Sequence, residues 1–235
     1  IGNDAELSAT ISGLNIEVNK LYAWCVIPKA IRDLEIGYVE KYFRAILKEA
    51  MYDGIAAGYL DGDGKTAPIG VLRQIGTVSQ DGTHTAKTVA QSLTGFSPKQ
   101  MAPVLTALSK NGKRPVMGLY LIANPTDVFQ YVNPALYGDS ISNGYVSKAF
   151  MPITVIQEPN IAAGKAVITM KGYYTMGFSG MKVEEYRETK AMDDADLFIA
   201  KTYGNGRAVD DAAAYVFNPT KLEEYIPTVL TKTEE

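Results

Sequence analysis

Apolar residues recur at steps of three and four across residues 36–50, which is the spacing of one face of an α-helix. The residues that share this face are Ile36, Val39, Phe43, Ile46, Leu47 and Ala50. The charged residues of the segment fall elsewhere, so the pattern predicts one long amphipathic helix. We expect the turn residues Gly62, Asp63 and Gly64 to end it, because glycine tolerates the left-handed backbone that a tight exit needs.

A different pattern precedes this helix. Over residues 7–27, apolar and polar residues alternate roughly, which is the two-residue period of a β-strand. Leu14, Ile16 and Val18 form the apolar side of the clearest part of the alternation. Pro28 lacks the N–H group that a strand ladder needs, so we expect it to mark the exit of the strand.

The second half of the chain favours strands. Residues 116–123 form a continuous apolar run, which predicts a strand buried on both faces. We expect further strands over residues 151–156, 166–170, 173–178 and 212–217, and an antiparallel pair over 181–188 and 196–203. Residues 61–95 and 137–147 are polar and predict loops, the first with short strands near Val71 and Thr77. Strands mixed with few helices indicate an α+β fold.

Two short motifs have the composition of helix starts. In Ser97-Pro-Lys-Gln, Ser97 is the candidate cap and Gln100 can reach back to it. Pro103 then requires that this helix either kinks there or starts later. Asn124 and Pro125 form the second signal, in Asn124-Pro-Thr-Asp.

Composition narrows the function classes. With 235 residues and 46% hydrophobic content, the chain can bury a real core. The net charge of −3 gives no sign of nucleic-acid binding. Cys25 is the one cysteine, so no internal disulfide can form, which indicates reducing surroundings. No apolar run approaches the ~20 residues that a membrane span requires.

The candidate catalytic side chains are few. His84 is the one histidine, and a Ser-His-Asp or Cys-His site would have to use it; in its polar segment we interpret it as an exposed loop residue. One histidine and one cysteine do not supply the usual zinc ligands. Cys25 follows Trp24 in an apolar strand, and we interpret it as a small buried side chain.

Three further motifs have a structural interpretation. Asp61-Gly-Asp-Gly suggests a calcium loop, but Lys65 stands where the third ligand belongs, which favours a turn. Ser179 and Lys182 have the S-x-x-K spacing, which needs a helix, whereas their stretch predicts a glycine-rich turn entering a strand. Gly204-Asn-Gly-Arg is a fragment of a phosphate loop and predicts a turn. We therefore expect no enzyme activity, no catalytic residue, no metal and no cofactor.

Several of these motifs occur together in one known family. The long helix, the Gly-Asp-Gly turn and Pro68-Ile-Gly-Val-Leu resemble the spine helix of the tailed-phage major capsid family, which has the Hong Kong 97-like fold. Lys20-Leu-Tyr-Ala-Trp-Cys-Val-Ile-Pro resembles the returning strand of its extended loop, and Tyr120-Leu-Ile-Ala-Asn-Pro-Thr-Asp its strand-to-helix step. Val183-Glu-Glu-Tyr-Arg-Glu and Phe198-Ile-Ala-Lys-Thr-Tyr-Gly-Asn-Gly-Arg resemble its closing hairpin and final strands.

The resemblance implies a specific architecture. A peripheral domain holds the spine helix and a β-hairpin, an axial domain holds a central mixed sheet with flanking helices, and part of an extended β-loop is present. The implied boundaries are 1–28 for the remainder of the loop, 29–80 and 177–204 for the peripheral domain, 81–176 and 205–220 for the axial domain, and 221–235 for a C-terminal tail. Since the chain begins at Ile1, inside the loop, the resemblance implies an N-terminally truncated or processed form.

The resemblance also implies a function. The chain is expected to be the major capsid protein of a tailed phage or prophage, whose hexamers and pentamers form an icosahedral shell around double-stranded DNA. It would assemble in the host bacterial cytoplasm and reside in the virion. Its expected partners are copies of itself, with scaffold, portal and decoration proteins as further candidates, non-specific contact to DNA, and no membrane.

A strand that leaves its own domain exposes groups that a neighbouring subunit would cover. The residues that we expect in this intersubunit contact are Leu14, Ile16, Val18, Lys20, Tyr22 and Trp24. In some members of the family, a lysine at the place of Lys20 forms an isopeptide bond with an asparagine of a neighbouring subunit. No asparagine occurs over residues 197–203 and Asn205 is displaced, so a solvated or ion-paired Lys20 is favoured.

Two alternatives remain open at the level of the sequence. An encapsulin-like compartment would share the fold and enclose protein cargo. A small serine-dependent hydrolase would use Ser179 or His84.

Overall fold

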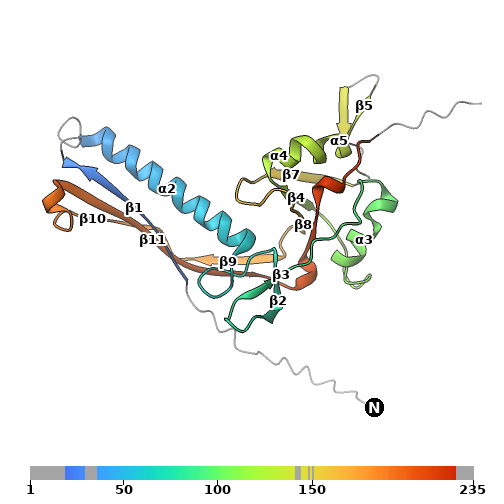
Figure 1. Ribbon diagram of the computed structural model, residues 1–235, viewed down its shortest axis with the longest axis horizontal. Helices are drawn as coiled ribbons and strands as arrows, with labels where there is room; N and C mark the ends of the chain where they lie inside the picture. The colour runs from blue at the N-terminus through green and yellow to red at the C-terminus, as the bar shows by residue number, and fades with distance from the viewer. Residues whose placement is uncertain (1–18, 30–35, 141–143, 148, 150, 226–235) are drawn as a thin grey trace, which may run out of the picture.

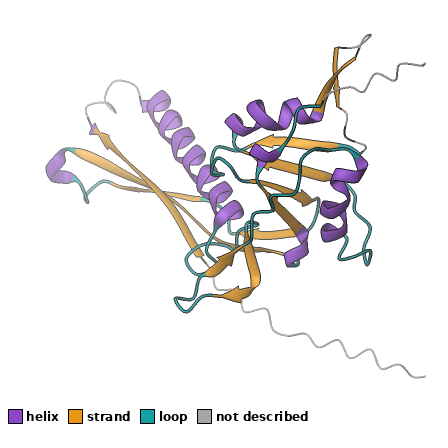
Figure 2. Cartoon of the chain, turned by 45° about the vertical axis from the view of Figure 1, so that its right-hand side comes forward, coloured by secondary structure: helices purple, strands orange, loops and turns teal. Residues whose placement is uncertain are grey.

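The computed structural model describes residues 19–29, 36–140, 144–147, 149 and 151–225. The described chain has two parts, which we call the arm and the body (Figure 1). The arm consists of the long helix α2 (Ile36–Asp61) and a sheet of β1, β9, β10 and β11. The body consists of a second four-stranded sheet and the shorter helices, as Figure 2 shows.

Helix α2 lies along the arm sheet and packs on β1 and β11, which confirms the predicted long helix. Leu47 and Met51 are buried against the sheet, and Phe43 is partly buried. Ile46 and Ala50, which the sequence placed on the same face, are exposed. That part of the prediction is wrong because the sheet covers only a narrow side of the helix. At about 100° per residue, Ile46 lies about 100° around the axis from Leu47, and Ala50 lies about 100° from Met51.

Gly62 and Gly64, which follow α2, must be glycine for two different reasons. Gly64 has a φ of 76°, the left-handed conformation expected from the sequence. Gly62 does not; instead, its carbonyl oxygen accepts a hydrogen bond from the N–H of Gly70 at 2.9 Å. A Cβ on Gly62 would lie 2.0 Å from the carbonyl oxygen of Pro68. Gly62 is therefore required by the contact between two backbone segments, and the left-handed explanation is wrong for it.

The arm sheet is antiparallel and has the order β1-β11-β10, with β9 on the other end of β11. Its strands are β1 (Asn19–Pro28), β9 (Tyr174–Phe178), β10 (Lys182–Tyr186) and β11 (Ala195–Ala208). The predicted pairing of β10 with β11 and the exit at Pro28 are confirmed. The turn predicted at Gly204 is wrong, because this residue continues β11. A Cβ there would lie 2.5 Å from Cδ1 of Phe178, so only glycine fits.

The body sheet is mixed and has the order β12-β8-β4-β7. Its strands are β4 (Leu119–Ala123), β7 (Ile153–Gln157), β8 (Ala166–Met170) and β12 (Ala214–Phe217), each close to a predicted strand. β4 and β7 are parallel, whereas the other neighbours are antiparallel. The mixed sheet agrees with the predicted α+β fold.

The helices of the body cover one face of this sheet. They are α3 (Pro98–Leu108), α4 (Pro125–Asp127), the π-helix η1 (Val128–Val132) and α5 (Asn133–Leu136). Buried side chains such as Met101 and Val128 pack with Leu121 and Ile168 in the largest core cluster. The opposite face of the sheet packs against the end of α2, through Leu60.

Both predicted helix starts are confirmed. Gln100 Oε1 accepts hydrogen bonds from the N–H and the hydroxyl of Ser97, at 3.2 and 2.7 Å. α3 begins at Pro98 and contains Pro103, so the alternative of a later start is wrong. The side chain of Asn124 accepts the N–H of Thr126 at 3.1 Å.

The remaining elements are short. Two hairpins are formed by β2 (Arg73–Val78) with β3 (His84–Ala86), and by β5 (Tyr137–Ser140) with β6 (Gly144–Ser147). The second hairpin lies where the sequence predicted a polar loop, so that prediction is wrong. Three 3-10 turns are η2 (Ala191–Asp193), η3 (Asp211–Ala213) and η4 (Pro219–Lys221).

One arginine ties the end of α3 to the chain that enters β12. Arg114 donates hydrogen bonds to the carbonyl oxygens of Leu108 and Ala212 and to the carboxylate of Asp210. Its guanidinium also lies 4.5 Å from the ring centre of Tyr173. The side chain is 12% exposed, so these contacts are largely shielded from water.

Candidate assembly surface

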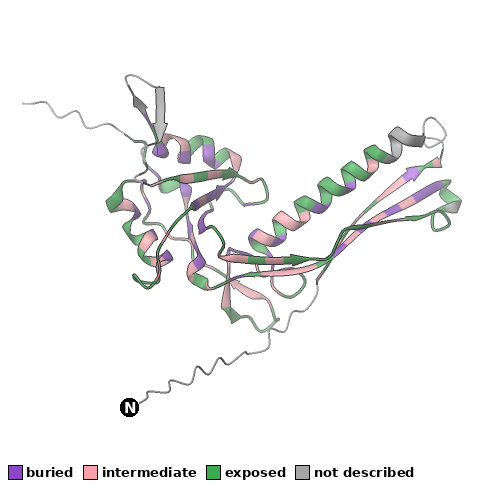
Figure 3. Ribbon diagram, turned by 180° about the vertical axis from the view of Figure 1, so that it is seen from behind, coloured by how far each residue is buried: buried purple, intermediate pink, exposed green. Residues whose placement is uncertain are grey.

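Side chains of β1 alternate between the two faces of the arm sheet. Leu21, Ala23 and Cys25 point toward α2 and pack against its core cluster. Tyr22 and Trp24 point the other way and are 59% and 63% exposed. Figure 3 shows that α2 lies on one side of the arm strands, with exposed residues along them. β1 therefore presents two large aromatic side chains that the described residues leave more than half exposed.

The pairing register extends this surface across three strands. Tyr22 lies opposite Lys201 and Trp24 opposite Ile199, and directly paired residues share a face. The next pair in the row is Ile199 with Glu184 on β10. We call this surface the outer face of the arm; its residues are Lys20, Tyr22, Trp24, Val26, Lys182, Glu184, Tyr186, Leu197, Ile199, Lys201 and Tyr203.

One ion pair lies within the outer face. Lys201 Nζ donates to Glu184 Oε2 at 2.6 Å, and the hydroxyl of Tyr186 donates to the same oxygen at 2.6 Å. The hydrogen bond from Lys201, followed by that from Tyr186, lowers the pKa of Glu184. The same hydrogen bond raises the pKa of Lys201. The outer face thus combines large aromatic side chains with one ion pair, and Lys20 and Lys182 add two exposed cations.

The structure places three of the six predicted contact residues. Lys20, Tyr22 and Trp24 lie on the outer face, where Lys20 Nζ is 5.3 Å from the ring centre of Tyr22. Leu14, Ile16 and Val18 lie outside the described residues. Lys20 is opposite Tyr203, whereas Asn205 is further along β11 and pairs with Gly177. The intersubunit role of these residues stays a prediction.

The histidine is not the exposed loop residue that the sequence suggested. His84 belongs to β3 and is partly buried. Its N–H donates to the carbonyl oxygen of Asp63, and its ring Nδ1 donates to that of Gln74, both at 2.8 Å. A Cβ on Gly64 would lie 2.2 Å from the imidazole ring. His84 therefore closes the turn after α2 onto the β2–β3 hairpin.

Asp63 organises that turn. Its carboxylate accepts the N–H groups of Lys65, Thr66 and Ala67 at 2.9 to 3.0 Å, and the hydroxyl of Thr66 at 2.9 Å. Burial raises the pKa of the carboxyl, but these hydrogen bonds outweigh it and lower the pKa to about 2. Within the described residues, no group of three or more His, Cys, Asp or Glu side chains could hold a metal ion. The geometry here is that of a turn, as the sequence favoured.

The other reactive side chains have structural contacts. Ser179 Oγ accepts the N–H of Tyr203 at 3.0 Å, and no helix joins Ser179 to Lys182, which begins β10. The Ser-Lys geometry of acyl-serine enzymes is therefore not formed. Cys25 is partly buried, and burial raises the pKa of its thiol.

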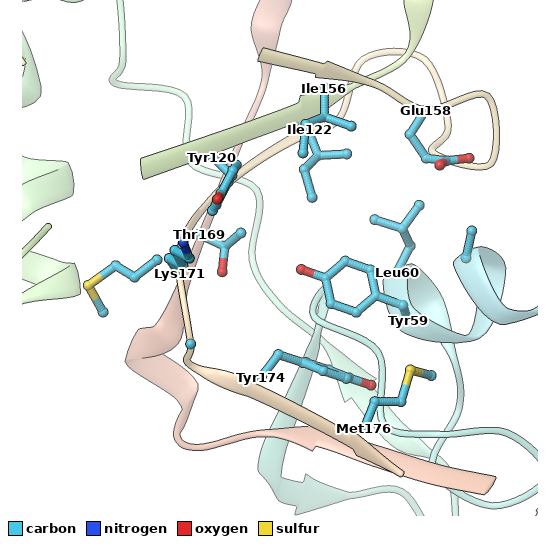
Figure 4. A pocket seen from close by; sticks show the side chains of 13 residues that line it. Tyr59, Leu60, Tyr120, Ile122, Ile156, Glu158, Thr169, Lys171, Tyr174 and Met176 are labelled. Atoms are coloured by element: carbon cyan, nitrogen blue, oxygen red, sulfur yellow. The ribbon is translucent and has the colours of Figure 1, made fainter. Parts of the chain in front are cut away.

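A groove of about 460 Å³ lies where the arm meets the body (Figure 4). Tyr59 and Leu60 of α2 form one wall, and Tyr120 and Ile122 of β4 form another. The rings of Tyr59 and Tyr174 meet edge to face with centres 4.6 Å apart. No local sequence pattern indicates this groove, since its residues come from distant segments.

No described helix is long and apolar enough to cross a membrane. Searches with protein-family models and among curated proteins give no match for the chain. Solved structures do match over most of its length.

The capsid of an empty GTA particle matches with a TM-score of 0.59 and 15% identity, over 89% of this chain and 79% of that chain. A structure of Mycobacterium phage Che8 matches with a TM-score of 0.56 and 18% identity, over 86% and 71%. The SrpI encapsulin complex from Synechococcus elongatus PCC 7942 matches with a TM-score of 0.57 and 13% identity, over 89% and 78%. The chain has the Hong Kong 97-like capsid fold, which confirms the fold expected from the sequence.

Proposed function

We propose that this chain is the major capsid protein of a tailed phage or prophage, whose copies form hexamers and pentamers of an icosahedral shell around double-stranded DNA. The observation that carries the proposal is the fold match to a GTA capsid over 89% of the chain. The function is structural, and no enzymatic role is part of it.

The outer face of the arm supports self-assembly. Tyr22 and Trp24 are more than half exposed, and neighbouring positions on β11 and β10 add further apolar area. Contiguous exposed apolar surface of this kind marks interaction sites in soluble proteins. Tyrosine and tryptophan are also enriched at the centres of protein interfaces. Head-to-tail contacts made through such a surface can close into rings.

The remaining partners follow from the same proposal. Contact with packaged DNA is proposed as non-specific only, since the net charge of −3 gives no sign of a nucleic-acid-binding protein. Scaffold, portal and decoration proteins are further candidate partners. The proposed place of assembly is the host bacterial cytoplasm, and the proposed final location is the virion.

A protein nanocompartment is the second candidate, favoured by the fold match to an encapsulin with a TM-score of 0.57. The two candidates differ in what the shell encloses. Purified particles should contain nuclease-protected DNA if the capsid proposal is correct, and co-purifying protein without DNA if the nanocompartment is correct. Portal and terminase genes beside this gene would also favour the capsid.

The first test is negative-stain electron microscopy of the gene product, expressed from its own start codon and fractionated by size. Closed icosahedral shells, or free hexamer and pentamer rings, are the expected result. A monodisperse monomer under several salt conditions would contradict the assembly proposal and leave only the fold.

The second test concerns the contact residues. We expect Tyr22→Asp and Ile16→Asp to block assembly, because a charge would have to be buried without a partner in the interface. Tyr22 is 59% exposed, so the variant subunit should remain folded. Tyr42→Asp is the matched control, since Tyr42 is 55% exposed on α2 and lies away from the outer face. Assembly of Tyr22→Asp at the wild-type level would contradict the assignment of the outer face.

A further inference from the structure

Asparagine is followed by glycine at three places in this chain, Asn111-Gly112, Asn143-Gly144 and Asn205-Gly206. In this dipeptide the backbone nitrogen of glycine can attack the side-chain amide of asparagine, because glycine has no side chain that would block the approach. The local sequence gives the three pairs the same chemistry. Asn143 lies outside the described residues, whereas Asn111 and Asn205 have different surroundings in the structure.

Asn111 lies in an exposed turn shortly after α3. Lys110, Asn111 and Gly112 all have left-handed backbone conformations, with φ values of 54°, 57° and 81°. This conformation is unfavourable for lysine, which has a Cβ, so the turn depends on its hydrogen bonds. A Cβ on Gly112 would meet no atom within 4 Å, so nothing packs against that side of the turn. Within the described residues, the side-chain amide of Asn111 forms no hydrogen bond.

The N–H of Gly112, which is the attacking group, donates to Oγ of Ser109 at 3.0 Å, at the protein surface. The preceding N–H, that of Asn111, donates to the carbonyl oxygen of Thr106 at 2.9 Å. The turn is therefore anchored to α3 on the N-terminal side of Asn111. On its other side, Gly112 is held through an exposed hydroxyl, and a local opening of this kind costs little free energy.

Asn205 has the opposite surroundings. It lies inside β11 and pairs with Gly177 of β9, and the carbonyl oxygen of Gly206 accepts the N–H of Ile69 at 2.8 Å. A Cβ on Gly206 would lie 2.8 Å from Cγ of Met176, so the chain is closely packed on that side. The N–H of Gly206 donates to Oδ1 of Asn205 at 2.7 Å, so the nitrogen directs its hydrogen at the side chain and not the lone pair that attack requires. Attack at Asn205 would require part of β11 to open first.

We propose that Asn111 is a deamidation site of the folded protein, whereas Asn205 is protected by β11. The nitrogen of Gly112 bonds to Cγ of Asn111, and its proton passes to the side-chain nitrogen, which leaves as ammonia. Water then opens the resulting succinimide ring at either carbonyl, which gives aspartate or isoaspartate. The reaction consumes one water and releases one ammonia. It needs no cofactor, and it is independent of the proposed shell-forming function.

Both products change the end of α3. Each adds a negative charge near the C-terminal end of this helix, where the helix dipole opposes it. Isoaspartate also adds a carbon atom to the backbone before Arg114, which donates to the carbonyl oxygens of Leu108 and Ala212. We therefore expect deamidated protein to hold α3 less firmly against the chain that enters β12.

Peptide mapping of the full chain, after incubation in mildly alkaline buffer, tests the proposal. Chymotrypsin cleaves after leucine and tyrosine, so it releases residues 109–119 and 204–215, each with one Asn-Gly pair. Deamidation raises the mass of a peptide by about 1 Da. In the folded chain we expect Asn111 to convert at least about tenfold faster than Asn205, which reacts only when β11 opens.

In urea the two asparagines should convert at similar rates, because the unfolded chain leaves only their common local sequence. Equal rates in the folded chain would overturn the proposal. It would also be overturned if folding slowed the conversion of Asn111 by about tenfold, since the turn would then be protected as β11 is.

Asn111→Gln is the matched variant, because the longer side chain closes a larger ring and reacts far more slowly. Isoaspartate is detected with isoaspartyl methyltransferase and labelled S-adenosylmethionine. We expect label in residues 109–119 of the incubated parent and none there in incubated Asn111→Gln. The urea midpoint should fall on incubation in the parent and stay constant in the variant, each compared with its own fresh sample. Label without a fall in the midpoint would overturn the loosening of α3 and leave the deamidation site standing.

Discussion

The turn at the end of α2 depends on one charged side chain, and this can be tested by changing Asp63 to asparagine. The carboxylate accepts four hydrogen bonds, three from backbone N–H groups and one from the hydroxyl of Thr66. Asparagine keeps the shape of the side chain and one acceptor oxygen, but it loses the charge. The comparison therefore isolates the charge-assisted part of these bonds.

The size of the stabilisation by the Asp63 carboxylate follows from its pKa. Burial raises this pKa, but the hydrogen bonds outweigh burial and lower the pKa from 3.8 to about 2. At about 1.36 kcal/mol for each pKa unit, a fully shielded carboxylate would stabilise the fold by about 2.4 kcal/mol. Asp63 is partly exposed, and solvent screening reduces this to about 1 kcal/mol.

The pH dependence has a defined sign. The pKa is lower in the folded chain than in the unfolded chain, so the stabilisation is fully present above the unfolded pKa of 3.8. It is lost as the pH falls through about 2. We therefore expect Asp63→Asn to lower the free energy of unfolding by about 1 kcal/mol at neutral pH and to match the parent at the acid end.

The assay is urea unfolding followed by far-ultraviolet circular dichroism at a series of pH values. Parent and variant both carry Tyr22→Asp, so that assembly does not add to subunit stability. Asp53→Asn, an exposed carboxylate on α2, is the control and should change stability by less than about 0.5 kcal/mol. Equal urea midpoints for parent and Asp63→Asn at neutral pH would refute the reasoning. A lower free energy of unfolding of the variant that persists unchanged in acid would also refute it.

Three further predictions concern packing and charge. Met51→Ala, at a side chain with no exposed surface, should lower the free energy of unfolding by about 3 kcal/mol in urea titrations, because it empties the small core of the arm. Gly204→Val should reduce the yield of soluble protein even with Phe178→Ala added, since its Cβ would lie 2.5 Å from Phe178 Cδ1 and also 2.7 Å from the carbonyl oxygen of Gly177. Arg114→Met should cost about 3 kcal/mol in the same urea assay, whereas Lys110→Met, at a side chain that is 45% exposed, should cost less than about 1 kcal/mol.

Local pattern was sufficient for most elements of the fold. The three- and four-residue spacing predicts α2, the apolar runs predict β4 and β8, and the caps at Ser97 and Asn124 lie at the first turns of their helices. These signals work because they depend on residues a few positions apart, whose geometry the backbone alone fixes. The separation of Tyr22 and Trp24 from the residues that face α2 came from the structure, since residues 21–27 are apolar or aromatic without a break.

The sequence alone did not determine the features that depend on contacts between distant segments of the chain. Which side of α2 is buried was decided by the sheet beneath it, so Ile46 is exposed although its spacing suits the core. Gly204 was taken for a turn because its contact with Phe178 exists only once β9 pairs with β11. The outer face and the groove join segments separated by more than a hundred residues. Only the tertiary structure brings them together, because no pattern over a few neighbouring residues says which distant strand will pair with which.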